Sequence, residues 1–307
     1  MQVYVVGAGA MGCLYGAALH NGGARVTLID TNTAHLEAIN RDGLELETRR
    51  GVERLHIPSC QPGEAQSTAD LILLFTKTYH SDAALNGVKH LIGEHTHVLT
   101  LQNGLGNAER VAQHVPQDKV LAGISTLPAD LLGPGRVRSL GDGGTKLYPA
   151  FGGDAAFAGK VCGILNEGHL PSELEPKILE AIWAKAVFNS TMNSLCSLTR
   201  RTPGFFIDKD EGRTLIRTLV EEGVAAARAN GVMIEAGPIH TLTEVSMTDH
   251  ADHEASMLQD VKAGRRTEVD AICGAIAEAA KAKGVPTPVT ETMWRLVKLE
   301  EAKQAES

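Results

Sequence analysis

Hydrophobic positions in the first half of the chain fall into short runs separated by longer amphipathic stretches. Runs rich in Val, Ile and Leu predict buried strands, and the Ala- and Leu-rich stretches between them, such as 10–20 and 34–39, predict helices. Strands that alternate with helices predict parallel βαβ units and a doubly wound sheet. The expected strands are residues 3–6, 25–29, 70–75, 97–101, 120–124, 136–140 and 146–151, with a hairpin formed by 44–48 and 53–57.

The pattern changes after about residue 171, where the period typical of helices replaces the strand runs. The sequence therefore predicts an α/β fold with two domains: an N-terminal doubly wound sheet over residues 1–170 and a C-terminal all-helical domain over residues 171–307. No strand is expected in the second domain. Its helices are expected at 176–198, 213–230, 251–263, 268–283 and 288–302.

Composition and charge argue against several classes of protein. The chain has 307 residues, a formal net charge of -8 and no basic block longer than a pair of arginines, so we expect no nucleic-acid partner. The longest apolar run, residues 71–75, is far too short to cross a bilayer, and no basic-then-apolar leader precedes the first strand. Five scattered cysteines without a C-x-x-C pair are typical of free thiols. We therefore expect a cytoplasmic protein without a membrane partner.

A glycine-rich segment links the first predicted strand to the first predicted helix. It reads Gly7-x-Gly9-x-x-Gly12, with Ala10 and Met11 at the start of the helix. Glycines permit the tight turn, let a pyrophosphate approach the backbone and let the helix pack on the strand, while the helix N-terminus offers N–H groups to phosphate. A glycine-rich turn without a ligand is the alternative. The strand before and the helix after favour a Rossmann-type dinucleotide site.

The second predicted strand ends in an acid, Asp30, which is followed by Thr31. A carboxylate at this position can accept hydrogen bonds from both hydroxyls of the adenosine ribose, and it repels a 2′-phosphate. The sequence therefore favours NAD(H) as the cofactor and leaves NADP(H) open. The alternative is that Asp30 only caps the turn that follows the strand.

Three polar residues repeat at four-residue spacing on the helix predicted for 176–198: Lys185, Asn189 and Asn193. Each step turns only about 40° around the helix axis, so the three side chains lie on one side. Asparagine is a poor helix former, and the strip has no neighbouring carboxylates to pair with. The strip is either a hydrogen-bonding surface in a cleft or an ordinary solvated face, and the spacing leaves both open.

A second polar cluster contains Ser256 and Glu268. Glu268 is expected in the first turn of a helix, where the helix dipole favours a carboxylate, so helix-end electrostatics is the simpler interpretation. Nearby, the run 249–253 holds two histidines and two acids, but no cysteine and no distant third ligand. We interpret that run as an acidic helix start and expect no metal.

In their order along the chain, these motifs resemble the ketopantoate (2-dehydropantoate) 2-reductase family. The resemblance covers nearly the whole sequence. The matching segments are the glycine motif, Lys77 after the strand at 70–75, Gln102-Asn103-Gly104 after the next strand, Lys185-x-x-x-Asn189-x-x-x-Asn193, and Ser256-Met257-Leu258-Gln259-Asp260 followed by Glu268.

The resemblance implies roles for these residues. Lys185 is expected to be the general acid, because an ammonium can stabilise and protonate the alkoxide that hydride transfer creates. Glu268 is expected to be the second catalytic residue, near the nicotinamide ribose and the substrate hydroxyl. Asn189, Asn193 and Ser256 are expected to hold a 2-keto acid, and Lys77 and Asn103 to line the cofactor.

Two positions depart from the family pattern. Members that use NADPH typically carry a basic residue where this chain has Asp30-Thr31. The family also often has a further substrate-site asparagine about ten residues beyond the strip, where this chain reads Arg201-Thr202-Pro203-Gly204.

The leading hypothesis is an enzyme of the kind used in pantothenate biosynthesis, which reduces ketopantoate or a similar branched 2-keto acid to the D-2-hydroxy acid with NADH. We expect a homodimer formed through the helical domain. An NAD-dependent D-2-hydroxy acid dehydrogenase of the same superfamily is the closest alternative. A dinucleotide-sensing protein without turnover is a further alternative from another class.

Overall fold

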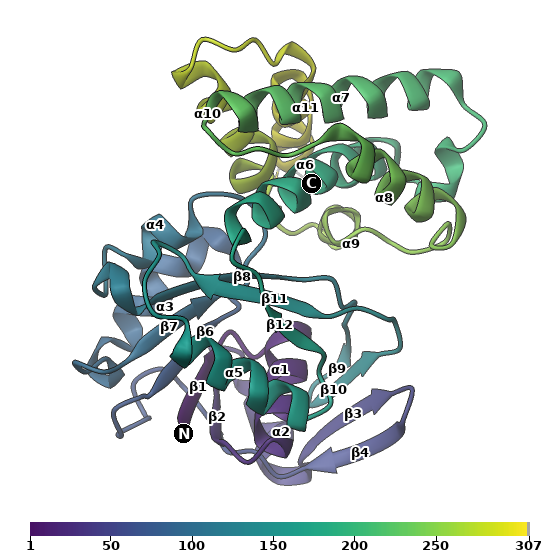
Figure 1. Cartoon of the computed structure of the whole chain (residues 1–307). Helices are drawn as coiled ribbons and strands as arrows, with labels where there is room; N and C mark the ends of the chain where they lie inside the picture. Colours follow the sequence, from purple (N-terminus) through teal and green to yellow (C-terminus); the bar gives the residue numbers. More distant parts are fainter. Residues whose placement is uncertain (306–307) are drawn as a thin grey trace. The chain divides into compact units, whose positions relative to one another are not determined.

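The computed structural model describes residues 1–305 and divides into two compact units. The first unit contains Met1–Gln102 and Asn107–Ile178, and the second contains Asn103–Gly106 and the chain from Leu179 onward (Figure 1). The sequence places the domain boundary at residue 170. A short strand at Ser172–Leu174, which the sequence does not predict, still belongs to the sheet of the first unit.

The first unit is built on an eight-stranded sheet. Its strands are β1 (Gln2–Val6), β2 (Arg25–Ile29), β5 (Ser59–Cys60), β6 (Leu71–Leu74), β7 (His97–Thr100), β8 (Val120–Ser125), β11 (Thr145–Pro149) and β12 (Ser172–Leu174). Their order across the sheet is β12-β11-β8-β7-β6-β1-β2-β5, and the strands from β8 to β5 are parallel. The direction of strand addition reverses between β1 and β6, the place where open α/β sheets bind ligands.

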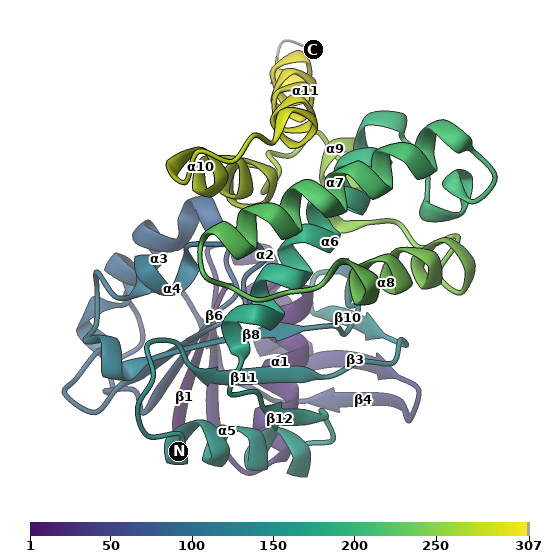
Figure 2. The same ribbon diagram turned by 45° about the horizontal axis from the view of Figure 1, so that its top comes forward.

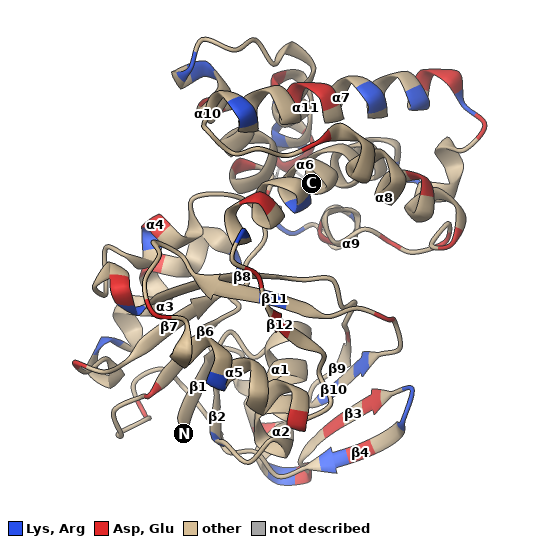
Figure 3. Cartoon of the chain, viewed as in Figure 1, with Lys and Arg blue, Asp and Glu red and all other residues tan. Residues whose placement is uncertain are grey.

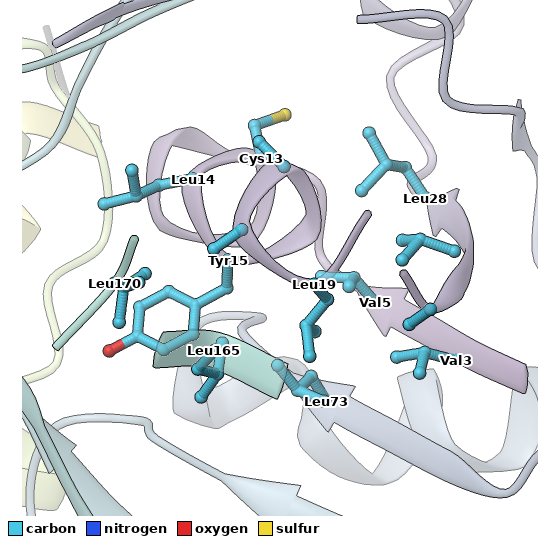
Figure 4. Packing of buried hydrophobic residues seen from close by; sticks show 14 of the residues in the cluster. Val3, Val5, Cys13, Leu14, Tyr15, Leu19, Leu28, Leu73, Leu165 and Leu170 are labelled. Atoms are coloured by element: carbon cyan, nitrogen blue, oxygen red, sulfur yellow. The ribbon is translucent and has the colours of Figure 1, made fainter. Parts of the chain in front are cut away.

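Helices cover both faces of this sheet, which confirms the doubly wound architecture. Val3 and Val5 of β1 belong to one buried cluster, while Tyr4 and Val6 belong to another. Tyr15 and other residues of the helix after β1 pack on the Val3 face, as Figure 4 shows. That face is covered by α1 (Ala10–Asn21) and α5 (Ala156–Glu167), and the other by α3 (Ser81–Gly87) and α4 (Asn107–Val111).

A separate four-stranded sheet has the order β4-β3-β10-β9, with β3 (Leu44–Thr48), β4 (Gly51–Leu55), β9 (Asp130–Gly133) and β10 (Arg136–Ser139). The predicted hairpin is confirmed as the antiparallel pair of β3 and β4. Glu45 of β3 accepts hydrogen bonds from Arg54 at 2.6 Å and from Arg136 at 2.8 Å. Charges of both signs are interspersed along these strands (Figure 3), and exposed pairs of this kind add little stability each.

The second unit is helical (Figure 2). Its helices are α6 (Ile178–Thr199), α7 (Asp210–Ala229), α8 (Ala236–Thr248), α9 (Ser256–Lys262), α10 (Ala275–Ala282) and α11 (Pro288–Ala305). A π-helical turn at Asp270–Gly274, which we call the π-turn, leads directly into α10. The remaining helical elements are α2 (Thr33–Asp42) and four 3-10 turns at Thr78–His80, Lys89–Leu91, Gln117–Lys119 and Pro203–Phe206.

Helix α6 is buried on most sides along its second half. Trp183 and Val187 belong to a cluster with Val220 and Val224 of α7, and further along Met192 and other residues of α6 enter a second cluster. A Cβ atom at Gly223 would lie 2.6 Å from a methyl group of Val187, so glycine lets α6 and α7 approach closely. The polar residues of α6 are therefore fixed in place by packing.

The N-terminus of α11 is capped from another helix. The Glu222 carboxylate of α7 accepts hydrogen bonds from the Val289 N–H at 3.0 Å, the Thr290 N–H at 2.7 Å and the Thr290 hydroxyl at 2.7 Å. The Thr287 hydroxyl, which could otherwise cap this helix, is buried without a hydrogen-bond partner among the described residues. A carboxylate at a helix N-terminus is favoured by the free N–H groups and by the helix dipole.

In the second unit, three differences separate the predicted helices from the observed ones. The predicted helix at 251–263 begins only at Ser256, and the predicted helix at 268–283 begins as the π-turn. Helix α8 was not predicted because Gly237, Pro238 and its threonines are poor helix formers. Pro238 is tolerated there because it lies in the first turn, where its missing N–H is not needed. Across the described residues, no helix has both the length and the apolar character needed to cross a bilayer.

Candidate functional site

The glycine segment has the geometry that its sequence predicts. Gly7 has φ +94°, and a Cβ atom there would lie 2.6 Å from the Thr76 nitrogen. A Cβ atom at Gly12 would lie 2.0 Å from the Gly7 carbonyl oxygen. Both positions therefore require glycine, one for backbone conformation and close approach, the other for packing of α1 on the loop.

Gly9 has a different environment. A Cβ atom at Gly9 would meet no atom of the described chain within 4 Å, so it would occupy open space above the start of α1. In α1, which the structure describes in full, no side chain caps the N-terminus and the first turn holds no acid. Ala10 and Met11 begin this helix, where backbone N–H groups lack intrahelical acceptors. The loop therefore fits a bound pyrophosphate, because the absence of a Cβ atom at Gly9 leaves space for it.

Asp30 has the turn-capping role that the sequence left as an alternative. Its Oδ1 atom accepts hydrogen bonds from the N–H groups of Thr31 at 2.8 Å and Asn32 at 2.9 Å. Asn32 in turn caps α2 by accepting from the His35 N–H at 3.2 Å. Both bonds to Asp30 go to one oxygen, so the turn orients the carboxylate without using Oδ2. Capping and ribose binding are therefore compatible.

A buried chain of hydrogen bonds connects this turn to the glycine loop. The Gly135 N–H donates to His35 Nδ1 at 3.0 Å, which leaves the ring proton on Nε2, 3.5 Å from Cys13 Sγ. The Cys13 thiol donates to the Ala8 carbonyl at 3.1 Å. Burial, with the nearby Asp30 charge, raises the pKa of Cys13, so the thiol keeps its proton. The sequence carries no signal for the contact between Cys13 and His35, because it depends on the tertiary fold.

Gly7, Asp30 and Lys77 follow the carboxyl ends of three neighbouring parallel strands, β1, β2 and β6. Gln102, after β7, connects to the segment after β6 at the same edge. Its Nε2 donates to the Thr76 carbonyl at 2.6 Å and to the Ser81 hydroxyl at 2.9 Å. The first unit therefore brings its predicted cofactor residues to one edge of the sheet, at the point where strand order reverses.

The polar strip of α6 is largely buried. Asn189 is 8% exposed and Asn193 is 6% exposed, while Lys185 is partly buried. Burial excludes the solvated face that the spacing had left open. The three residues come from one side of a single helix, so their relative positions are set by the α6 backbone.

The two asparagines differ from the hydroxyl residues on the same helix. Ser190, Ser194 and Ser197 each satisfy their hydroxyls by donating to a carbonyl three or four residues earlier. By contrast, the side-chain amides of Asn189 and Asn193 make no hydrogen bond with any described residue. Buried amides usually have partners, so these two are suited to an external ligand.

Lys185 and Glu268 interact electrostatically. Burial lowers the pKa of Lys185 from 10.5 to about 8, although the Glu268 charge acts in the opposite direction. Glu268 is buried and lies just before the π-turn. An amine with a pKa near 8 is protonated at neutral pH and can still release its proton, which is the property that a general acid needs.

The π-turn contacts both α6 and the loop that carries Asn103. Cys273 donates to the Ser190 carbonyl of α6 at 3.6 Å, and the Leu105 N–H donates to the Ala271 carbonyl at 2.9 Å. Gly104 has φ +89°, and a Cβ atom there would lie 2.2 Å from the same Ala271 oxygen. The loop that carries Asn103 is thereby fixed to the segment that follows Glu268.

Ser256 is the first residue of α9, and its side chain is exposed. The next residue, Met257, packs in a buried cluster with Val269 and Ile272. The second unit therefore assembles α6, α9, the π-turn and the Asn103 loop, and these segments carry all the predicted catalytic and substrate residues. Within residues 1–305, no group of three His, Cys, Asp or Glu side chains is arranged to hold a metal ion.

With a glycine loop on a parallel sheet and a separate helical unit, the chain has the architecture of two-domain oxidoreductases that use a nicotinamide dinucleotide. Comparison with protein families narrows this class. Residues 3–150 match the model described as Ketopantoate reductase PanE/ApbA, and residues 177–301 match Ketopantoate reductase PanE/ApbA C terminal. The chain belongs to the ketopantoate reductase PanE/ApbA family, which confirms the resemblance seen in its motifs.

Relatives match this chain along nearly its full length. The 2-dehydropantoate 2-reductase of Streptococcus pyogenes serotype M3 is 34% identical over 303 residues, covering 98% of both proteins. The enzyme of the same name from Pyrococcus horikoshii is 35% identical over 309 residues, also covering 98% of both. Among solved structures, a ternary complex of D-mandelate dehydrogenase with NADH and anilino(oxo)acetate has a TM-score of 0.95 and 30% identity, covering 99% of this chain and 100% of that one.

Proposed function

We propose that this chain reduces a 2-keto acid with a nicotinamide dinucleotide and forms the D-2-hydroxy acid, as a 2-dehydropantoate 2-reductase acting on ketopantoate or a similar branched acid. The observation that carries the proposal is the α6 strip, where Lys185 has a pKa of about 8 beside two buried asparagine amides without partners among the described residues. The 34% identity to 2-dehydropantoate 2-reductase over nearly the whole chain supports the same reaction.

The reaction divides into hydride addition and protonation. When bound, the dinucleotide supplies the hydride. Lys185 donates its proton to the oxygen of the keto group as negative charge develops there, which both stabilises and neutralises the alkoxide. Glu268 keeps the Lys185 ammonium charged, because its own charge raises the pKa of Lys185. In this proposal its carboxylate also lies near the hydroxyl that forms on the product.

In this proposal the side-chain amides of Asn189 and Asn193 bind the keto acid. Asn189 and Asn193 donate hydrogen bonds to the keto oxygen or the carboxylate without adding charge to a buried site, and Ser256 adds a hydroxyl. Lys77 and Asn103 contact the cofactor. Because a buried amide left unpaired is costly, a substrate that satisfies Asn189 and Asn193 gains specificity as well as affinity.

The cofactor is NAD(H) rather than NADP(H) in this proposal. The turn after β2 holds the Asp30 carboxylate by Oδ1, which leaves Oδ2 to accept from the adenosine ribose. A 2′-phosphate at the same position would meet the charge of that carboxylate, and Thr31 offers no cation to bind it. NADH in the D-mandelate dehydrogenase structure supports the same cofactor.

A second candidate is oxidation of a D-2-hydroxy acid with NAD. The TM-score of 0.95 to D-mandelate dehydrogenase favours it, and so does the departure at Arg201-Thr202-Pro203-Gly204 from the reductase pattern. In that direction Lys185 would accept the hydroxyl proton as a general base, for which a pKa near 8 is equally suitable.

One panel of substrates separates these candidates. We expect NADH oxidation with ketopantoate or another branched 2-keto acid, with higher kcat/KM for NADH than for NADPH. Highest kcat/KM for D-mandelate with NAD would favour the second candidate. NADH binding without turnover of any 2-keto acid or D-2-hydroxy acid would contradict both and indicate a dinucleotide sensor.

The chain is also proposed to act as a homodimer in the cytoplasm. Several large apolar residues of the helical unit are exposed, among them Leu242 at 50%, Leu296 at 43% and Leu299 at 65%. Contact between two copies would cover such residues. The described chain has five free cysteines and no disulfide, as expected in a reducing compartment. Light scattering of the purified protein measures the oligomeric state directly.

A further inference from the structure

The segment that carries Glu268 is held by α11, the last helix among the described residues. Glu301 of α11 accepts two hydrogen bonds at Oε1, from the Thr267 N–H at 2.7 Å and from the Thr267 hydroxyl at 2.6 Å. The Glu301 side chain is only 11% exposed. Hydrogen bonds to a buried carboxylate are among the stronger ones in proteins, so this contact fixes the residue immediately before Glu268.

A second carboxylate holds the other side of the same segment. Asp270 accepts from the Trp294 indole N–H at 2.8 Å, from Lys298 at 3.1 Å and from Arg266 at 3.2 Å. Burial by itself would raise the pKa of Asp270, but these hydrogen bonds lower it below its usual value. Lys298 also pairs with Glu301 at 2.7 Å, so one ammonium on α11 joins the two carboxylates.

The π-turn connects this network to the Asn103 loop. The Gly274 N–H donates to the Val269 carbonyl, five residues back, at 3.0 Å. A Cβ atom at Gly274 would lie 2.8 Å from the Trp294 ring, so glycine lets α11 pack directly on the turn. The Ala271 carbonyl accepts the Leu105 N–H instead of continuing a regular helix. π-turns of this kind occur frequently at functional sites.

We propose that Glu301 is a positioning residue, which sets the place of the Glu268 carboxylate relative to Lys185 through its two bonds to Thr267. This inference rests on the proposed function for the roles of Glu268 and Lys185, but it concerns a residue that touches neither substrate nor cofactor. It makes α11, the helix that ends the described chain (Figure 2), a support of the site.

Removal of Glu301 is expected to lower the pKa of Lys185, because that pKa depends on the nearby Glu268 charge. The Glu268 charge raises the pKa of Lys185, so a displaced Glu268 stabilises the ammonium less. The lysine then loses its proton at lower pH, and the alkaline limb of the rate profile moves in the same direction. Misplacement of a catalytic group by about 1 Å can cost up to about 100-fold in rate, so kcat is expected to fall by about 10- to 100-fold.

The test compares Glu301→Ala, which removes the acceptor of both Thr267 bonds, with Glu300→Ala. Glu300 is the preceding carboxylate on α11 and pairs with Arg200, so its variant controls for loss of a charge from the same helix. We expect Glu301→Ala to lower kcat, leave the Kd for NADH unchanged and move the alkaline limb to lower pH, while Glu300→Ala does none of these. Thr267→Val, which removes the hydroxyl partner, should produce the same shift in smaller measure.

A readout without turnover completes the experiment. In protein carrying lysine labelled with ¹³C at Cε, NMR titration follows the Lys185 signal, which is assigned by its loss in Lys185→Met. We expect its pKa to fall in Glu301→Ala and to stay constant in Glu300→Ala. An unchanged Lys185 titration in a folded Glu301→Ala protein would overturn the inference. If the titration moves while the wild type reduces no 2-keto acid, the proposed function fails and the positioning role of Glu301 stands.

Discussion

Replacing Lys185 by methionine tests the proton donor assigned to the reaction. Methionine is similar in length and uncharged, so it removes the proton while keeping an apolar stem in place. With a pKa of about 8, roughly nine tenths of Lys185 is protonated at pH 7. General acids typically contribute about 10²- to 10⁴-fold, so we expect kcat of Lys185→Met to fall within that range, with an unchanged Kd for NADH.

The same variant is expected to be more stable than the wild type at neutral pH. The unfolded chain holds this proton up to a pKa of 10.5, whereas the folded chain holds it only to about 8. Folding is therefore penalised below pH 8, and the penalty is relieved as the pH rises from 8 to 10.5. A shift of this size is worth on the order of 3 kcal/mol, as an upper limit because Lys185 is partly accessible. Urea unfolding of Lys185→Met and of the wild type at pH 7 and pH 10 measures the difference in their free energies of unfolding, which should be smaller at pH 10.

The rate assay is kcat between pH 6 and pH 10 with a 2-keto acid and NADH. The wild type should lose activity above about pH 8, and Lys185→Arg should remain strongly impaired because arginine does not release its proton in this range. Glu268→Gln should move the alkaline limb to lower pH, because it removes the charge that raises the pKa of Lys185. An arginine variant with near-normal kcat and an unchanged alkaline limb would show that the proton comes from a group other than Lys185.

Three further predictions test the cofactor, the substrate site and the fold. Asp30→Ala combined with Thr31→Arg should move the ratio of kcat/KM values toward NADPH, and equal efficiency with both cofactors in the wild type would contradict the role of Asp30. Asn193→Ala should weaken keto-acid binding by about 1–3 kcal/mol without changing NADH affinity; separate titrations measure both, and a large loss of NADH affinity would count against the assignment. Glu222→Ala leaves three donors of α11 without their acceptor and should lower the free energy of unfolding by about 1–3 kcal/mol in urea titrations, whereas an unchanged midpoint would show that water replaces the carboxylate.

The parts of the fold that the sequence predicts are those with strong local patterns. Strand β6 is an unbroken run of Leu and Ile and β1 has Val at three of its five positions, because both strands are buried on both faces, and such runs are visible without the structure. The glycine motif is equally local, since three turn and packing constraints fall within six residues. Strands β5 and β12, with two and three residues, are too short to produce a period, and β9 has no buried run because both of its leucines are exposed.

The site was less predictable because its contacts join distant parts of the chain. The spacing of Lys185, Asn189 and Asn193 placed them on one side of a helix, but only packing against α7 and neighbouring segments shows that the two asparagines are buried. Thr267 and Glu301 are 34 residues apart in sequence, and no local pattern connects them. The π-turn likewise arises from tertiary contacts, where helical periodicity alone predicts a regular helix from Glu268 onward.

NADH in which both hydrogens at nicotinamide C4 are replaced by deuterium tests whether this chain transfers a hydride to a 2-keto acid. Purified protein is incubated with the labelled cofactor and ketopantoate in ordinary water, and the product is analysed by mass spectrometry and chiral chromatography. Direct hydride transfer predicts a D-2-hydroxy acid that carries deuterium at C2. A product without deuterium would contradict direct hydride transfer, and so would a protein that binds NADH and yet reduces neither ketopantoate nor any other 2-keto acid.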